Sequence, residues 1–120
     1  MISILVIMIL GFGKINVNAE EFPTIDQIYN EDKGYGVLDT YIHITNSDLV
    51  SNVQAPTWSN ENGQDDLIWN GMEKCDITID GINYNYKVST DGKAHKNVFG
   101  NYQMHFYANV NGTKQYIGKQ

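Results

Sequence analysis

The residues best suited to chemistry lie in the stretch WSNENGQDDLIWN, which covers positions 58–70 and ends one residue after the second tryptophan. Glu61, Asp65 and Asp66 offer carboxylate oxygens, the ligands by which extracellular loops hold calcium. The stretch lacks the regular ligand alternation of a calcium loop, and its Asn-Gly pair is typical of a turn. Asp65 and Asp66 are also adjacent, so in a strand they would face opposite sides and could not act as the acid and base of a glycosidase. We expect a loop between two strands, with a calcium site at the three carboxylates as the alternative.

The histidines and the cysteine are the other candidate ligands or nucleophiles. His43, His95 and His105 fall on separate expected elements without a short ligand spacing, and Cys75, the only cysteine, lies on another element. This scatter favours structural roles over a zinc site or a Cys-His nucleophile. The sequence also contains no nucleophile elbow, phosphate-binding glycine loop or basic stripe. We therefore predict that the protein is not an enzyme and holds no metal or cofactor, and that Cys75 is a small buried hydrophobe.

The first part of the chain has the pattern of an export signal. Residues 1–19 contain the apolar run ISILVIMILGFG, which is too short to span a bilayer, and end with Val17 and Ala19 at the spacing that signal peptidase reads. We predict cleavage after Ala19 and a secreted protein, extracellular or associated with the cell wall, with no membrane contact after cleavage. Residues 20–34 carry Pro23 and no periodicity, so a flexible leader is expected there. Cleavage after Ala19 leaves 120 − 19 = 101 residues, which is the size of one domain.

The charge balance narrows the range of partners. The chain has 14 Asp and Glu against 8 Lys and no Arg, which gives a formal net charge of −6. Nucleic acids and anionic membranes are poor partners for such a chain. The single cysteine excludes an intramolecular disulfide, so the burial of side chains must hold the fold together.

Residues 35–120 have the pattern of an all-β domain. Segments rich in β-branched and aromatic residues alternate with turn signals, and no stretch has a helical stripe. Asp80-Gly81 and Asn111-Gly112 each separate two alternating segments, and both pairs favour tight hairpins because Asn, Asp and Gly tolerate positive φ. We predict an immunoglobulin-like antiparallel β-sandwich of about seven strands.

The segment GNYQMHFYA, at positions 100–108, predicts one face of the core. Alternation puts Tyr102, Met104 and Phe106 on one side of a strand and His105 and Tyr107 on the other. Tyr102 follows a glycine by two positions. This arrangement is similar to the tyrosine corner of immunoglobulin-like sandwiches, in which the hydroxyl bonds to upstream backbone.

The large side chains are expected to have two roles. The residues expected to fill the core are Trp58, Trp69, Tyr102, Met104 and Phe106. Replacement of Trp69 by Ala is therefore expected to unfold the domain. The residues expected to form a flat strip for binding glycan rings or a partner protein are Tyr84, Tyr86, His105, Tyr107 and Tyr116. For the tyrosines, the alternative is simply their high β-propensity.

Three separated motifs resemble the GBS Bsp-like repeat. They are PTWSNENGQDDLIW, AHKNVFGNYQMHFYA and NGTKQYIG, in that order, and the similarity covers residues 50–118. The resemblance implies a non-catalytic accessory module of exported and surface proteins of Gram-positive bacteria, often found beside cell-wall amidase or other peptidoglycan-hydrolase domains. The segment between Trp69 and His95 is more elaborate than a simple repeat, and we expect no catalytic domain beside it. The resemblance implies no ligand residues.

We therefore expect a secreted, non-catalytic module that recognises a cell-wall polymer or glycan. One alternative is a secreted protein-binding module, such as an inhibitor or a ligand of a host surface. Another is an accessory domain detached from a peptidoglycan hydrolase. The first two are separated by whether a wall polymer or a protein is retained on the immobilised domain.

Overall fold

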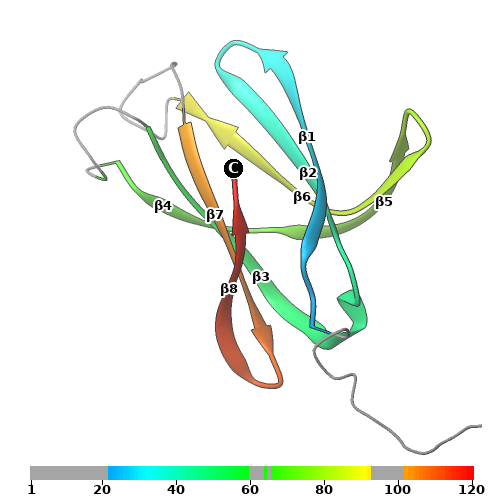
Figure 1. Ribbon diagram of the computed structural model, residues 1–120. Coiled ribbons are helices and arrows are strands. Elements are labelled where there is room, and N and C mark those ends of the chain that lie inside the picture. Colours follow the sequence, from blue (N-terminus) through cyan, green and yellow to red (C-terminus); the bar gives the residue numbers. More distant parts are fainter. Residues whose placement is uncertain (1–21, 60–63, 65, 93–101) are drawn as a thin grey trace, which may run out of the picture.

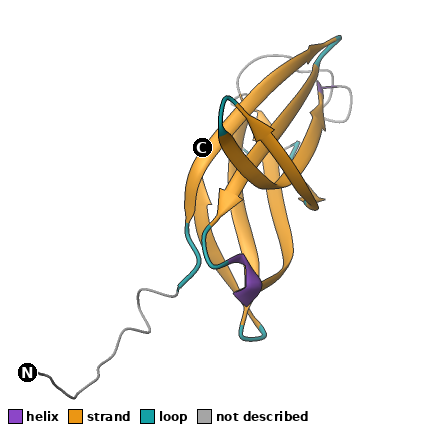
Figure 2. Ribbon diagram, turned by 90° about the vertical axis from the view of Figure 1, so that its right-hand side faces the viewer, coloured by secondary structure: helices purple, strands orange, loops and turns teal. Residues whose placement is uncertain are grey.

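The alternating segments of the sequence form strands that pair into two antiparallel sheets. The computed structural model describes residues 22–59, 64, 66–92 and 102–120, and their strands make an all-β sandwich (Figure 1). Sheet A has the order β1 (Ile25–Gly34), β2 (Val37–Ile44), β6 (Ile82–Asp91), β5 (Glu73–Ile79). Sheet B has the order β4 (Ile68–Gly71), β3 (Val50–Ser59), β7 (Tyr102–Val110), β8 (Thr113–Lys119). A short 3-10 turn, η3 (Ser47–Leu49), joins β2 to β3 at one end of the sandwich (Figure 2).

The strand order is that of an immunoglobulin-like sandwich. Sheet A corresponds to strands A-B-E-D of that fold, and sheet B corresponds to C-F-G with the additional strand C′ at its edge. The predicted sandwich is confirmed, with eight strands in the described part of the chain instead of about seven. The expectation of a flexible leader over residues 20–34 is wrong for residues 25–34, because these form β1 and pair with β2.

β1 lacks a clear apolar alternation because polar side-chain hydrogen bonds, as well as apolar packing, hold it to the rest of the sandwich. Ile28 packs against the core, whereas Asn30 exchanges two side-chain hydrogen bonds with Gln120 at the end of the chain. The Asn30 Nδ2 donates to Gln120 Oε1 at 2.7 Å, and the Gln120 Nε2 donates to Asn30 Oδ1 at 3.2 Å. Thr40 of β2 also donates to Asn30 Oδ1, at 2.7 Å. The amide pair therefore links an edge strand of sheet A to the end of sheet B.

Two tight turns follow the expected pattern. Asp80-Gly81 joins β5 to β6, and Asn111-Gly112 joins β7 to β8. Both residues of each pair have positive φ, 51° and 81° in the first turn and 53° and 81° in the second. These angles are those of a type I′ turn, whose twist matches an antiparallel hairpin. Both predicted hairpins are confirmed, and they fix which side chains of the paired strands lie opposite one another.

The core lies between the two sheets and is filled mainly by aliphatic side chains. Phe106 and Ile42 are 0% exposed and Met104 is 2% exposed. Complete burial of a side chain such as Phe106 contributes about 2–3 kcal/mol. Trp58, Trp69 and Tyr102 do not belong to this core, which corrects the expectation that they fill it: Trp58 and Tyr102 are half-buried and Trp69 is 47% exposed.

β4 and β5 belong to one run of chain that changes sheets. The chain pairs with β3 in sheet B as far as Gly71, and after Met72 it pairs with β6 in sheet A from Glu73 onward (Figure 1). The backbone N–H of Met72 donates to the Val53 carbonyl at 2.8 Å, so β3 still holds the joint between the two strands. The two layers are therefore connected by a crossing of a single residue.

The predicted signal peptide, residues 1–19, lies outside the part of the chain that the structure describes. Within the described part, no helix has the length and apolar character needed to cross a membrane.

Candidate binding face on sheet B

The outer side of sheet B carries aromatic residues from all four strands. Alternation along β7 turns His105 and Tyr107 away from the buried side of that strand. The register places Tyr116 of β8 opposite Tyr107, and it places Trp69 of β4 opposite Pro56 of β3. Side chains that are far apart in the sequence therefore share one surface.

Five rings follow one another across this surface without a break. The ring centroid of Trp58 lies 4.9 Å from that of His105, which lies 5.4 Å from that of Tyr116. The Tyr107 ring lies 5.6 Å from Tyr116 and 5.3 Å from Trp69. Three of the four contacts are edge-to-face, a geometry that aromatic pairs prefer. We call these five residues the aromatic face.

The aromatic face is held in place and remains open to solvent. Trp69 and Tyr116 are each 47% exposed, and the other three residues are half-buried. The Lys114 Nζ lies 4.6 Å from the centroid of the Trp69 ring, which is a cation–π contact. Cross-strand pairs of this kind contribute about 0.2–1 kcal/mol each to a sheet. The rings are therefore ordered before any ligand arrives, which lowers the entropic cost of binding.

Trp58 faces outward because small residues occupy the buried side of β3. Ala55 and Thr57 are both 0% exposed and Val53 is 3% exposed. Trp58 follows Thr57 directly, so alternation turns its side chain to the opposite side. The sequence contains this alternation, since Val53, Ala55 and Thr57 recur with period two. The prediction of buried tryptophans followed from their large apolar side chains instead.

The structure brings together three of the five residues predicted for binding. His105, Tyr107 and Tyr116 belong to the aromatic face, whereas Tyr84 and Tyr86 lie on β6 of sheet A and are each 4% exposed. Tyr86 is part of the core, and Tyr84 packs against tyrosines of β1 and β2 at centroid distances of 6.2 Å. The expectation that these two residues form an exposed strip is wrong, because β6 is an interior strand whose alternate residues are buried.

The carboxylates of the calcium alternative are described only in part. Glu61 and Asp65 lie outside the described residues. Asp66 is 5% exposed, and both its carboxylate oxygens accept the backbone N–H of Ser59 at 3.1 Å. Burial raises the pKa of Tyr102, the first residue of β7, and the negative charge of Asp66 adds to this shift. Asp66 therefore has a structural role at the end of sheet B.

The histidines and the cysteine lie on different elements. The His43 Nδ1 lies 2.7 Å from Asp26 Oδ1 in sheet A, His105 belongs to the aromatic face, and His95 is outside the described residues. The Cys75 thiol donates to a backbone carbonyl of β6 at 3.4 Å, and burial raises its pKa. Among the residues that the structure describes, no three His, Cys, Asp or Glu side chains gather in a way that could hold a metal ion.

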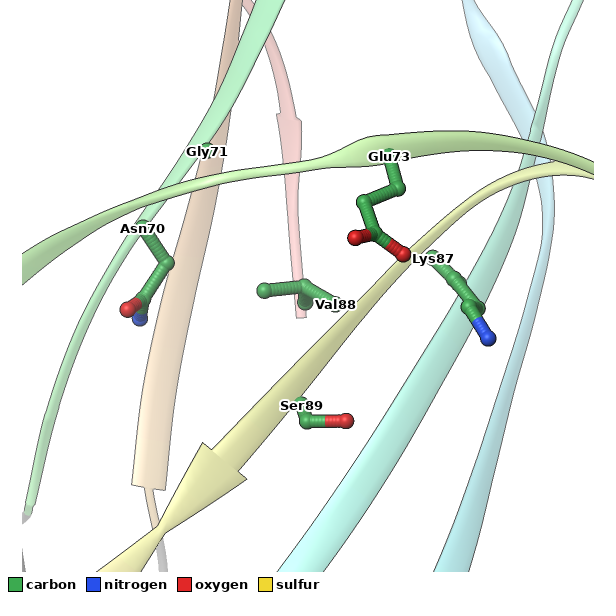
Figure 3. Close-up of a pocket in the computed structure, with 6 residues that line it drawn as sticks. All are labelled: Asn70, Gly71, Glu73, Lys87, Val88 and Ser89. Atoms are coloured by element: carbon green, nitrogen blue, oxygen red, sulfur yellow. The ribbon is translucent and has the colours of Figure 1, made fainter.

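A small polar pocket lies where the chain crosses from sheet B to sheet A. Its volume is about 210 Å³, and its lining residues are Asn70, Gly71, Glu73, Lys87, Val88 and Ser89. Figure 3 shows Asn70 on one side of the pocket and Glu73 and Lys87, which are register partners, on the other. Small-molecule sites usually measure about 300–1,000 Å³ and are mostly apolar. The aromatic face is therefore the stronger candidate site.

Comparison with models of protein families shows to which family the chain belongs. The model of the GBS Bsp-like repeat matches residues 25–120, from the first residue of β1 to the last residue. The chain belongs to the GBS Bsp-like repeat family. The repeat thus includes both sheets and extends beyond residues 50–118, where the sequence motifs lie. GBS Bsp-like repeats are surface accessory domains and not a known enzyme family. Comparison with curated proteins and with solved structures gives no match.

Proposed function

We propose that this GBS Bsp-like repeat binds a glycan of the cell envelope through the aromatic face. The observation that carries the proposal is the unbroken series of five rings on the solvent side of sheet B. Sugar rings have flat apolar faces that pack on exposed aromatic rings such as those of Trp69 and Tyr116. Amide side chains flank the rings, since Gln54 lies opposite Tyr107 and Asn109 lies opposite Lys114 in the strand register. These amides supply hydrogen bonds to sugar hydroxyl groups.

The expected affinity of one domain is modest. An aromatic contact contributes about 0.5–1.5 kcal/mol beyond the area it buries. Two or three such contacts with sugar rings, together with the buried area, give about 3–5 kcal/mol, which corresponds to a Kd near a millimolar. Linked copies of the domain on one chain would bind a polymer more tightly through their high effective concentration.

Sedimentation with purified Gram-positive cell walls tests the proposal. The wild-type domain should sediment with the walls, and Trp69→Ala and Tyr116→Ala should each reduce the bound fraction. Tyr35→Ala is the matched control, because Tyr35 is 97% exposed on the turn between β1 and β2, away from the aromatic face. Tyr84→Ala is unsuitable as a probe, since a residue that is 4% exposed affects folding first. Failure of the wild type to sediment, at concentrations near the expected Kd, would refute wall binding.

A protein partner is the second candidate, because exposed Trp and Tyr residues also characterise protein interfaces. Walls stripped of protein by protease separate the two. Retention on the stripped walls, followed by release when a muramidase cuts the glycan strands, supports the glycan. Loss of retention after protease treatment, with the glycan intact, would instead identify a protein-binding module.

Export of the protein is part of the same proposal. The apolar run in residues 1–19 and the surface role of the family both support it. N-terminal sequencing of protein recovered from the culture medium should begin at Glu20. A chain that still begins at Met1 would contradict cleavage.

A further inference from the structure

Charge is divided unevenly between the two sheets. The strands of sheet B contain no Asp or Glu, and their lysines are Lys114 and Lys119, both on β8. The strands of sheet A contain seven acidic residues and three lysines. The chain as a whole has a formal net charge of −6. The strands that carry the aromatic face therefore have a net positive charge in an acidic protein.

The two lysines of sheet B have no carboxylate partner among the described residues. The two ion pairs found among the described residues both lie in sheet A. The Lys114 Nζ contacts the Trp69 ring instead, at 4.6 Å from its centroid, and Lys119 is in register with His105. The Lys114 ammonium group therefore lies beside a ring of the aromatic face, and Lys119 is an exposed residue at the strand position opposite His105.

The spacing of the lysines suits an extended ligand. Lys114 lies near the start of β8 and Lys119 at its end, with Tyr116 between them. A strand rises about 3.3 Å per residue, so the two positions are about 16 Å apart. A single sugar cannot reach both positions, whereas an oligosaccharide that carries charges along its length can.

We propose that the ligand of the aromatic face is an anionic glycan, whose sugar rings pack on Trp69 and Tyr116 while its carboxylate or phosphate groups pair with Lys114 and Lys119. This inference rests on the proposed function and adds charge as the basis of its specificity. The acidic strands of sheet A repel such a polymer, so it approaches the domain from the side of sheet B.

Intrinsic fluorescence measures binding at the aromatic face directly, because both tryptophans of the chain belong to it. The full chain is titrated with three soluble polymers that share one sugar backbone: neutral glycol chitin, carboxymethyl chitin and phosphorylated chitin. An exposed charge pair contributes about 0.2–1 kcal/mol, so with two lysines the anionic polymers should bind about two- to thirtyfold more tightly than glycol chitin at low salt. High salt should remove most of this difference.

Paired variants assign the effect to the two lysines. Lys114→Gln combined with Lys119→Gln should lower the affinity for both anionic polymers to that for glycol chitin, while Lys33→Gln, a change in sheet A, should leave it unaltered. The polymer that binds more tightly identifies carboxylate or phosphate as the preferred group. Equal binding of all three polymers would overturn the charge proposal and leave the proposed function standing.

Two further probes separate the glycan from other anions. Polyacrylate has carboxylates without sugar rings, and it should bind more weakly than carboxymethyl chitin. Equal binding of polyacrylate, or tighter binding of a single-stranded oligonucleotide than of either anionic chitin, would overturn the anionic glycan as the ligand. If none of the polymers changes the fluorescence, the proposed function fails together with this inference.

Discussion

Replacement of Trp69 by Ala tests whether the aromatic face is a surface or a part of the core. Trp69 is 47% exposed, so about half of its surface is buried. A large aromatic side chain buries about 150–250 Å² when it is fully enclosed. Half of that area, at about 25 cal/mol per Å², amounts to about 2–3 kcal/mol. Because the methyl group of Ala keeps part of this burial and an exposed site leaves no cavity, we expect a loss of about 2 kcal/mol.

A domain with a stability of about 5–15 kcal/mol survives such a loss. The Trp69→Ala variant should still melt cooperatively, at a temperature lowered by about 8–16 °C. This outcome replaces the sequence-based expectation that the variant unfolds.

Two comparison variants complete the calorimetric test. Phe106→Ala removes a side chain that is 0% exposed and should cost about 3–5 kcal/mol. Tyr35→Ala, at a residue that is 97% exposed, should change stability by less than about 0.5 kcal/mol. Loss of the cooperative transition in Trp69→Ala, together with its retention in Phe106→Ala, would refute the assignment of the two sides of sheet B.

Other residues of sheet A give three more predictions. The Ile44 N–H donates to Asn85 Oδ1 at 2.9 Å, and the Ile44 carbonyl accepts from Asn85 Nδ2 at 3.0 Å. Asn85→Ala should therefore lower the free energy of unfolding, measured in urea, by about 1–3 kcal/mol, and an unchanged value would contradict these bonds. Burial raises the pKa of Tyr86 above 10.0, so the unfolded chain loses this proton first and stability falls as the pH rises above that value. Thermal melts between about pH 8 and about pH 11 should show a smaller fall for Tyr86→Phe than for wild type, and identical curves would count against this cause. Burial also raises the pKa of the Cys75 thiol, so a disulfide reagent at neutral pH should modify the folded domain more slowly than the urea-unfolded chain; equal rates would indicate an accessible thiolate.

Local signals were sufficient to predict most of the fold. The hairpins at Asp80-Gly81 and Asn111-Gly112 follow from residue types that accept positive φ, and alternation along β7 identified its buried side. β1 could not be predicted in the same way. Its side chain Asn30 bonds to Gln120, which is 90 positions away, and no local pattern contains such a contact.

The candidate site was predictable only where the orientation of a side chain follows from its own strand. His105, Tyr107 and Tyr116 lie on the outer side of sheet B, as alternation and the hairpin between β7 and β8 require. Tyr84 and Tyr86 have the same period-two spacing but are buried. Which side of a strand is covered depends on how the two sheets pack, and the spacing within one strand does not contain that information.

The crossing from β4 to β5 limits how the length of the chain can vary. Met72 alone separates the last residue of β4 from the first residue of β5, so no loop residues are present there to absorb a change in length. Side chains alternate on both strands, and an insertion or deletion of one residue at Met72 would exchange the inward and outward positions of one of them. Added residues are tolerated instead at exposed turns such as Asn111-Gly112, which leave both neighbouring strands in phase. The outward side chains of β4 thereby remain on the same side of sheet B as the rest of the aromatic face.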